Sequence, residues 1–377
     1  MLKQTKKHKN LSGFAKHVQI EQEVKAEVLM RENELSDQES FSSRSKKLND
    51  TKVVFFESPG AVSLYSISQV QNLYQNARRI FGDDRERIVK EILADLSTKN
   101  NRRNLAGSPS AESIEQLKLN FPNFNEAIEQ IEFAAALSNL SNRCWFQMPP
   151  LLLLGPAGVG KTAFAQEFAK NLGVYFKRID VGTATTGSIL SGLSLGWGSG
   201  HTGEIFKAIN EAETANPLLM LDEIDKISHL STYPIEPTLL ALLEKESASN
   251  FREEAIQLHL NCKYFLWIAT ANDLNAISEP LKSRFTIVNI SMPNKEETQH
   301  IIRSIYSKIK ANNPWGRSFK SELDDSVVVE LVDFSPRELT RIMQAAFGKA
   351  ATRGRNEILN SDFVLPKKST YRKIGFL

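Results

Sequence analysis

The stretch that decides the fold is Leu151-Leu152-Leu153-Leu154-Gly155-Pro156-Ala157-Gly158-Val159-Gly160-Lys161-Thr162. Its four leucines predict a short buried strand. The segment Thr162 to Leu172 predicts a helix that ends at Gly173. Between them stands the pattern G-x-x-x-x-G-K-T, in the strand-to-helix context that a phosphate-binding loop requires. Glycines let successive backbone N–H groups point at a phosphate, and the helix start adds its positive dipole end.

The same loop predicts a site for ATP and Mg²⁺. We expect Lys161 to reach the β- and γ-phosphates and the Thr162 hydroxyl to ligate Mg²⁺. The predicted nucleotide-binding residues are Gly155, Pro156, Ala157, Gly158, Val159, Gly160, Lys161 and Thr162. A glycine-rich turn that binds nothing is the alternative, and the full eight-residue match argues against it.

A second motif, Leu218-Leu219-Met220-Leu221-Asp222-Glu223-Ile224-Asp225, places two carboxylates directly after an apolar strand. Open α/β sheets bind their ligands at the carboxyl ends of strands. We expect Asp222 to hold Mg²⁺ and Glu223 to orient and deprotonate the attacking water. Acidic residues also end strands simply because they are solvated, so this motif gains its weight from the phosphate-binding loop upstream.

Further apolar strands alternate with helices, which predicts a doubly wound parallel α/β sheet. The predicted strands are Leu151–Leu154, Val174–Val181, Leu218–Leu221, Tyr264–Thr270 and Thr286–Ile290. From Asn294 onward only helical patterns occur, which predicts a small all-helical domain. The stretch Asn100 to Ser113 has the composition of a linker.

These patterns divide the chain into four parts. We predict a charged, flexible tail at 1–50, an N-terminal helical region of unknown role at 51–118, a P-loop ATPase domain at 119–292, and a helical lid domain with a basic tail at 293–377.

Three polar residues follow the two motifs in an informative order. Asn272 ends a predicted strand, and Arg284 precedes the last strand. Arg337 lies in a helix that Ser335 is expected to cap, with Pro336 at its first position and Glu338 closing a capping box. Each of these residues alone would be typical of a solvated surface.

Together, the P-loop, the Asp-Glu strand and these three residues resemble the pattern of AAA+ ATPases, over roughly Phe121 to Phe363. Within that class the chain is similar to the ATPase module of Lon proteases, through Leu221-Asp222-Glu223-Ile224-Asp225-Lys226 and Pro280-Leu281-Lys282-Ser283-Arg284. The resemblance implies that Asn272 positions water and the γ-phosphate, and that Arg337 couples the lid to the phosphates. It also implies that Arg284 reaches the nucleotide of a neighbouring subunit, in a ring that is a hexamer by family habit.

Trp197 lies in the glycine-rich stretch Leu190–Gly200, where Lon carries a pore loop. The resemblance implies that Trp197 grips a translocating polypeptide, although the family's tyrosine-valine-glycine is replaced here. The alternative is that the indole packs as core beneath the loop.

Composition limits the remaining possibilities. A net charge of +3 over 377 residues does not favour nucleic acid as a partner. The two cysteines, Cys144 and Cys262, form no C-x-x-C pattern, and no apolar run is long enough for a membrane, so we expect a cytoplasmic protein. The chain ends at Leu377, just past the lid, so no protease activity is expected.

The sequence therefore predicts an ATPase that remodels or translocates a protein substrate, alone or with a separate protease. Two alternatives stay open at this point: a nucleotide-controlled assembly switch, and a DNA-directed motor or loader.

Overall fold

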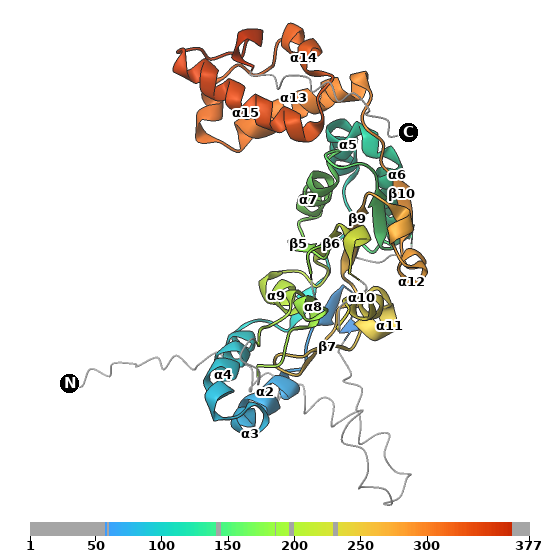
Figure 1. Cartoon of the computed structure of the whole chain (residues 1–377). Helices are drawn as coiled ribbons and strands as arrows, with labels where there is room; N and C mark the ends of the chain where they lie inside the picture. Colours follow the sequence, from blue (N-terminus) through green and yellow to red (C-terminus); the bar gives the residue numbers. More distant parts are fainter. Residues whose placement is uncertain are drawn as a thin grey trace, which may run out of the picture.

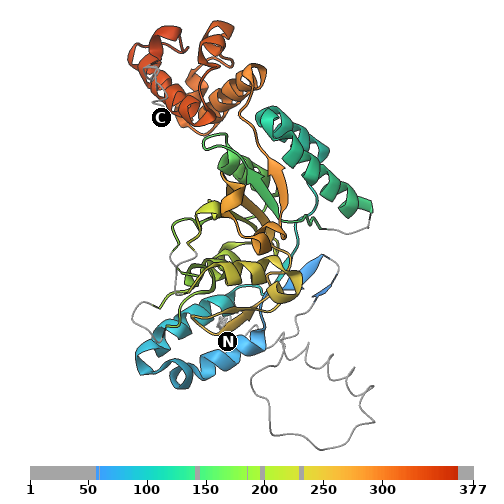
Figure 2. The ribbon, with the colours of Figure 1, turned by 45° about the vertical axis from the view of Figure 1, so that its right-hand side comes forward.

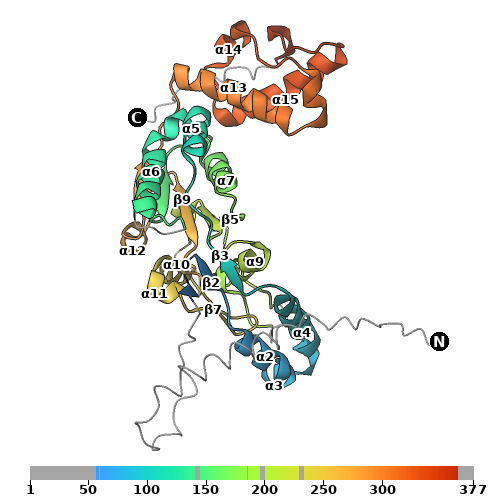
Figure 3. The same cartoon turned by 180° about the vertical axis from the view of Figure 1, so that it is seen from behind.

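The computed structural model describes residues 57–58, 60–140, 145–184, 186–195, 200–228 and 233–363. Along its length the molecule has three parts (Figures 1 and 3). Helices from the start of the described chain lie at one end, a β-sheet lies in the middle, and a helical domain lies at the other end.

The central sheet has five parallel strands in the order β10-β4-β9-β6-β5. Their bounds are β4 Leu151–Leu154, β5 Phe176–Asp180, β6 Leu218–Asp222, β9 Leu266–Ala271 and β10 Thr286–Asn289. The predicted doubly wound sheet is confirmed, and the strand bounds differ from prediction by at most two residues. Because all five strands are parallel, their carboxyl ends share one edge.

The two faces of the sheet pack into separate cores, as the alternation of side chains along a strand requires. Leu151 and Leu153 contribute to one core and Leu152 to the other. The first core is covered by α5 Ala111–Asn120, α6 Asn125–Leu140 and α7 Lys161–Leu172. Figure 2 shows α5 and α6, in teal, alongside the sheet. Phe124 and Phe164 stack there with ring centroids 4.6 Å apart.

The opposite face carries short elements from residues 188–282 together with the N-terminal ones. The former are α8 Ser188–Ser191, α9 Glu204–Glu211, η2 Ile224–Lys226, α10 Glu236–Leu243, α11 Lys245–Ala248, β7 Phe251–Glu253, β8 Leu258–Leu260, η3 Leu274–Ala276 and α12 Glu279–Lys282. The latter are β1 Glu57–Ser58, β2 Ala61–Ser63, α2 Ile67–Gln75, α3 Ala77–Phe81, α4 Asp83–Thr98 and β3 Arg102–Asn104.

The N-terminal elements share one hydrophobic core with this face of the sheet and the short elements that cover it. The buried Arg103 donates to the carbonyls of Ile209 and Ala212, and the Ala215 N–H donates to the Asn104 carbonyl over 2.9 Å. The expectation of a linker over Asn100–Ser113 is therefore wrong at its start, since β3 pairs with β2 there. The predicted domain boundaries stay predictions.

Beyond the sheet, the chain is helical, as predicted from Asn294 onward. The elements are α13 Lys295–Ala311, η4 Pro314–Ser318, α14 Asp325–Leu331, α15 Pro336–Thr352 and η5 Asn360–Asp362, around a core of their own. Ser335 caps α15, and Glu338 completes the predicted capping box. None of the helices in the described ranges combines the length and apolar character needed to cross a membrane.

Candidate active site

The loop between β4 and α7 has the backbone that the glycine pattern predicts. Gly158 and Gly160 have φ values of 86° and 107°, which L side chains rarely adopt. At Gly155 the constraint is space, because a Cβ there would collide with the carbonyl oxygen of Ile290. Gly160 immediately precedes α7, so the loop N–H groups lie at a helix N-terminus.

Lys161 connects this loop to the end of β9. Its ammonium donates to Asn272 Oδ1 over 2.9 Å and to the carbonyls of Gly155 and Ala271. Burial lowers the pKa of Lys161, and the carboxylates of Asp225, Asp222 and Glu223 act in the opposite direction. A half-buried cation held among carbonyl oxygens is suited to an anionic ligand that replaces those contacts.

Asp222 ends β6 and is buried, at 7% exposure. One carboxylate oxygen pairs with an Arg178 guanidinium nitrogen at 2.6 Å, and the other accepts from the Thr270 hydroxyl. Arg178 comes from the neighbouring strand β5 and also faces the cavity described below. The Asp222 carboxylate is therefore already paired with a cation. A metal ion that binds there has to share the carboxylate with Arg178 or displace the guanidinium.

Glu223 follows with the backbone in the left-handed region, at φ 58° and ψ 49°. This conformation is uncommon for a residue with a side chain and often marks a functional position. Its N–H donates to Thr270 Oγ1 over 3.0 Å, and its carboxylate pairs with Lys226 at 2.7 Å. Thr270 thus fixes both acidic residues from the adjacent strand.

Asp225 determines where Asn272 lies. Its Oδ2 accepts from the backbone N–H groups of Asn272 and Asp273, over 3.1 and 3.2 Å. The Asn272 side chain, held in this way, meets Lys161. The site is consequently a connected network of charges and hydrogen bonds across the ends of β4, β6 and β9.

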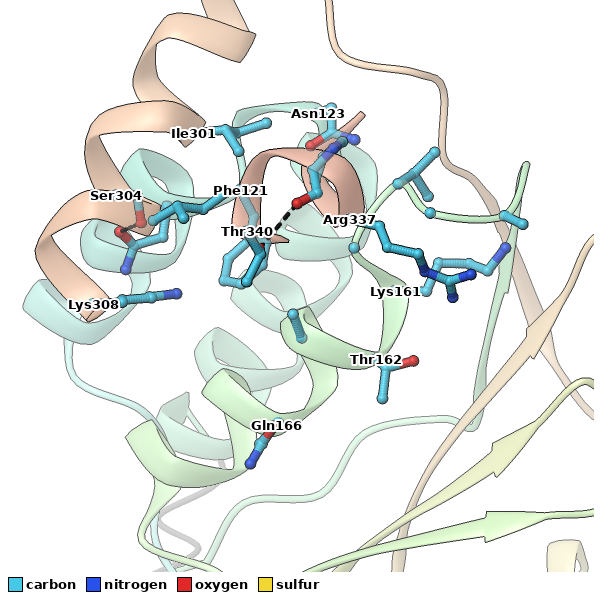
Figure 4. Close-up of a pocket in the computed structure, with 18 of the residues that line it drawn as sticks. Phe121, Asn123, Lys161, Thr162, Gln166, Ile301, Ser304, Lys308, Arg337 and Thr340 are labelled. Atoms are coloured by element: carbon cyan, nitrogen blue, oxygen red, sulfur yellow. Dashed lines mark hydrogen bonds between the residues drawn. The ribbon is translucent and has the colours of Figure 1, made fainter. Parts of the chain in front are cut away.

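The lid covers this network. A cavity of about 670 Å³ is lined by the P-loop, Arg178, Asp222, Glu223, Asn272 and the lid helices α13 and α15. A Cβ at Gly158 would lie 3.8 Å from Arg337 Cβ, so the first turn of α15 rests on the P-loop. Figure 4 shows the Arg337 side chain extending from that turn toward Lys161.

The other end of the cavity combines apolar and polar side chains. Phe121 and Asn123 from the segment before α6, and Ile301 and Lys308 from α13, line it (Figure 4). The Lys308 ammonium lies 4.6 Å from the Phe121 ring centroid and 3.4 Å from Glu167. Burial lowers the pKa of Lys308, against the attraction of Glu167. This arrangement suits a nucleotide, with its phosphates at the loop and its base beside Phe121.

The structure therefore brings together most, but not all, of the residues singled out in the sequence. Lys161, Thr162, Asp222, Glu223, Asn272 and Arg337 line one cavity. Arg284 does not: it donates to the Pro280 carbonyl and lies 3.9 Å from Glu244, at the end of α12. Trp197 lies outside the described residues. The roles of all these residues stay predictions.

Sequence reasoning missed Arg178, Thr270 and Asp225. Arg178 stands in a strand that reads as apolar, and Thr270 reads only as the end of another. Asp225 belongs to the quoted acidic motif, so its spacing after Glu223 was available as a signal. The contacts of all three depend on which strands are neighbours, which no local pattern states.

The region that carries this site is similar to known proteins. Residues 151–292 match the ATPase family associated with various cellular activities (AAA). The chain thus carries an AAA ATPase domain.

The particular relatives are Lon proteases. The chain is 31% identical to the Lon protease of Fusobacterium nucleatum over 188 residues, 50% of this chain and 24% of that protein. It is 29% identical to the Lon protease of Mycoplasma mobile over 303 residues, which are 78% of this chain and 35% of that protein. It is 32% identical to Lon protease 1 of Bacillus subtilis over 210 residues, which are 54% of this chain and 27% of that protein. The domain is therefore a Lon-like AAA+ ATPase domain, and the matches span only about a quarter to a third of these relatives.

Solved structures are more distant. The Holliday junction branch migration motor RuvB of Thermotoga maritima aligns at 17% identity with a TM-score of 0.41, covering 67% of each chain.

Proposed function

We propose that this protein binds ATP with Mg²⁺, hydrolyses it within a ring of identical subunits, and uses the energy to remodel or translocate a polypeptide. The observation that carries the proposal is the shared cavity: phosphate loop, acidic pair, Asn272 and the lid's Arg337 face one space. ATP supplies the phosphoryl group, and Mg²⁺ neutralises its developing charge.

The residues divide the work by position. Lys161 and the α7 N-terminus hold the phosphates, and Asp225, which accepts from the Asn272 N–H, keeps that amide at the γ-phosphate end. Glu223 takes the proton from the attacking water, which requires the carboxylate to leave Lys226. Arg337 couples the presence of the γ-phosphate to the position of the lid, because the helix that carries Arg337 begins against the P-loop.

The donor set suits Mg²⁺. Thr162 supplies a hydroxyl and Asp222 a carboxylate, both facing the cavity, and Mg²⁺ prefers such oxygen ligands together with phosphates and water. Arg178 competes for Asp222, so the fit includes movement of this guanidinium away from one carboxylate oxygen.

The position of Arg284 is an argument for the proposed ring. It lies outside the cavity of its own chain, at the end of α12, so an action on phosphate chemistry requires a second subunit. An arginine provided in trans is a known device for stabilising the transition state of phosphoryl transfer. We propose a homo-oligomer, with six subunits by analogy to the family.

The substrate class rests on similarity to Lon, a protease whose ATPase module the chain resembles. We propose a protein substrate, gripped by Trp197 and passed on to a separate protease or released.

Steady-state ATP hydrolysis tests this proposal. The purified protein is assayed alone, with an unfolded polypeptide, and with single- or double-stranded DNA. Stimulation by the polypeptide and not by DNA is expected, and Trp197→Ala should remove the stimulation while keeping the basal rate. Stimulation by DNA alone would favour a nucleic-acid motor. ATP-dependent assembly without stimulation by either would favour a switch.

A further inference from the structure

Thr270 has a single hydroxyl group that makes hydrogen bonds to both acidic residues of the site. It lies on β9 beside Asp222 on β6, each one residue beyond the paired positions Leu221 and Ala269. The residue is buried, at 1% exposure. Its hydroxyl donates to Asp222 Oδ1 and accepts from the Glu223 N–H over 3.0 Å.

The direction of these two bonds follows from the groups involved. The Asp222 carboxylate, which is paired with Arg178, can only accept, so the one hydroxyl hydrogen of Thr270 points to it. A lone pair of the same oxygen is then directed at the Glu223 N–H, which can only donate. The branched Cβ of threonine restricts rotation about χ1 and keeps the hydroxyl in this place. Thr270 therefore presents a fixed acceptor to the Glu223 backbone.

The Glu223 backbone has two reasons to need this acceptor. β6 ends at Asp222, so the Glu223 N–H has left the ladder that pairs β6 with β9. The residue is also in the left-handed region, at φ 58° and ψ 49°, which is unfavourable for a residue with a Cβ. Such a conformation persists where surrounding contacts hold it. In the described part of the chain, the hydrogen-bond acceptor at this N–H is the Thr270 hydroxyl.

This backbone conformation decides where the Glu223 carboxylate lies. The φ and ψ angles set the direction of the Cα–Cβ bond, so relaxation to the common right-handed region would swing the side chain away. A general base has to lie within hydrogen-bond reach of the water that it deprotonates. A displacement of about 1 Å at a reacting group can lower a rate about a hundredfold. The hydrogen bond from Thr270 is therefore important for catalysis although Thr270 acts at the backbone.

We propose that Thr270 is the residue that positions the general base: it holds the Glu223 backbone through a hydroxyl that Asp222 orients. This inference rests on the proposed ATPase function and goes beyond it, because it makes the placement of the base depend on the metal-binding carboxylate. Thr270 acts through Glu223 and not on the phosphates, so its loss should slow turnover and leave nucleotide affinity unchanged.

Thr270→Val keeps the shape of the side chain and removes the hydroxyl. At saturating Mg²⁺, its kcat should lie at least about tenfold below that of the wild type, while KM for ATP changes by less than about threefold. Thr270→Ser restores the hydroxyl and should recover kcat to within about threefold of the wild type. If Thr270→Val does not fold, Thr270→Ala, which places no methyl group beside Asp222, replaces it in the same comparison.

A measurement without nucleotide tests the contact itself. Amide hydrogen exchange at Glu223, followed by NMR on the full chain, should be at least about tenfold faster in Thr270→Val than in the wild type. Thr298→Val is the matched control, because Thr298 is also buried, at 2% exposure, and its hydroxyl donates to the Asn294 carbonyl over 2.6 Å. Thr298 does not line the cavity, so this variant should leave kcat and the Glu223 exchange rate unchanged.

Combination with Glu223→Gln shows whether Thr270 acts through Glu223. The base is already lost in Glu223→Gln, so adding Thr270→Val should slow turnover further by less than about threefold. If Thr270 acted independently of the base, the two losses would multiply. Turnover is measured with protein in excess over ATP, so that slow variants can be compared.

Each outcome has a distinct meaning. Wild-type kcat in both Thr270→Val and Thr270→Ala overturns the assignment of Thr270, as does a rise in KM with unchanged kcat. Thr270→Ser as slow as Thr270→Val, multiplied losses in the double variant, or an unchanged exchange rate at Glu223 also overturn it. Failure of the wild type to hydrolyse ATP overturns the proposed function instead, and the exchange measurement then still decides whether Thr270 holds the Glu223 backbone.

Discussion

Two cations occupy the carboxylates on which the proposed chemistry depends. Arg178 lies 2.6 Å from Asp222, and Lys226 lies 2.7 Å from Glu223. The first pair joins two neighbouring strands, and the second lies within one turn of chain. Binding of Mg²⁺ and activation of water both require these ion pairs to exchange partners. Arg178 and Lys226 therefore influence when the site becomes competent.

Replacing Arg178 tests the first of these pairs. Without the guanidinium, Asp222 keeps only the Thr270 hydroxyl, so Arg178→Met should lower the free energy of unfolding by about 1 kcal/mol, the scale of a half-exposed ion pair. Mg²⁺ with ADP should reduce this loss, because the metal then balances the same carboxylate. Thermal unfolding with and without Mg²⁺ and ADP measures both effects.

Arg78→Met is the matched control, since Arg78 pairs with Asp83 on the surface, outside the cavity. Its small effect should be the same with and without ligand. If the Arg178→Met loss were also independent of Mg²⁺ and ADP, competition for Asp222 would be contradicted.

At the scale of elements, the hairpin of β7 and β8 contacts the chain on both sides of Trp197, at Gly192 and Gly203. Glu253, at the end of β7, is fully buried, and its Oε1 accepts from the Gly203 N–H over 3.0 Å. A Cβ on Gly192 would collide with the same carboxylate oxygen. The hairpin therefore positions the chain at both glycines.

This carboxyl group makes stability depend on pH. Burial raises the pKa of Glu253 to about 8, with Glu254 acting in the same direction and Lys207 and the N–H groups of Gly203 and Ala255 in the opposite one. In the unfolded chain the group ionises near its ordinary pKa of 4.5. Between pH 4.5 and about 8 the Glu253 carboxyl group is protonated in the folded state and ionised in the unfolded state. The stability of the folded state therefore falls as pH rises from about 4.5 to about 8.

Glu253→Gln should remove that part of the pH dependence, because glutamine stays neutral. Urea unfolding at pH 5, 6.5 and 8 should show the wild type losing stability faster than the variant across this series. Glu246→Gln, which changes an exposed glutamate on α11 that does not act on Glu253, should behave as the wild type does. Parallel curves for wild type and Glu253→Gln would mean that Glu253 does not stay protonated in the folded protein.

How far the fold could be predicted from the sequence depended on the length of each element. The strands of the central sheet are four to six residues long and, apart from β5, mostly apolar, so their pattern identified them. The strands β1 to β3, β7 and β8 are two or three residues long, too short for a periodicity to be recognised. The P-loop and the cap of α15 were predictable because their chemistry is local. The Arg178–Asp222 pair was not, since strand order brings it together.

At the scale of the whole molecule, the proposed assembly depends on the role proposed for Arg284. The guanidinium is half-buried near Glu244, at a distance from the P-loop cavity of its own chain. If Arg284 acts on a neighbour, each active site consists of parts from two chains. Mixtures of differently damaged subunits can then regain activity that neither variant has.

Mixing Arg284→Ala with Glu223→Gln tests this directly. Each variant alone should hydrolyse ATP at least about a hundredfold more slowly than the wild type. In mixed rings, an Arg284→Ala subunit contributes its intact Glu223 to a site that a Glu223→Gln subunit completes with Arg284. Activity should therefore reappear on mixing and depend on the ratio of the two chains. No recovery in assemblies shown to contain both chains would assign Arg284 to its own chain's site or to structure alone.

The measurement that bears most directly on the central claim compares ATP binding and ATP turnover in wild-type and Glu223→Gln protein, with Glu246→Gln as a surface control. The account predicts that the wild type and Glu246→Gln hydrolyse ATP, while Glu223→Gln binds ATP with similar affinity and turns it over at least about a hundredfold more slowly. Wild-type turnover in Glu223→Gln, or no ATP binding by the wild type, would contradict it.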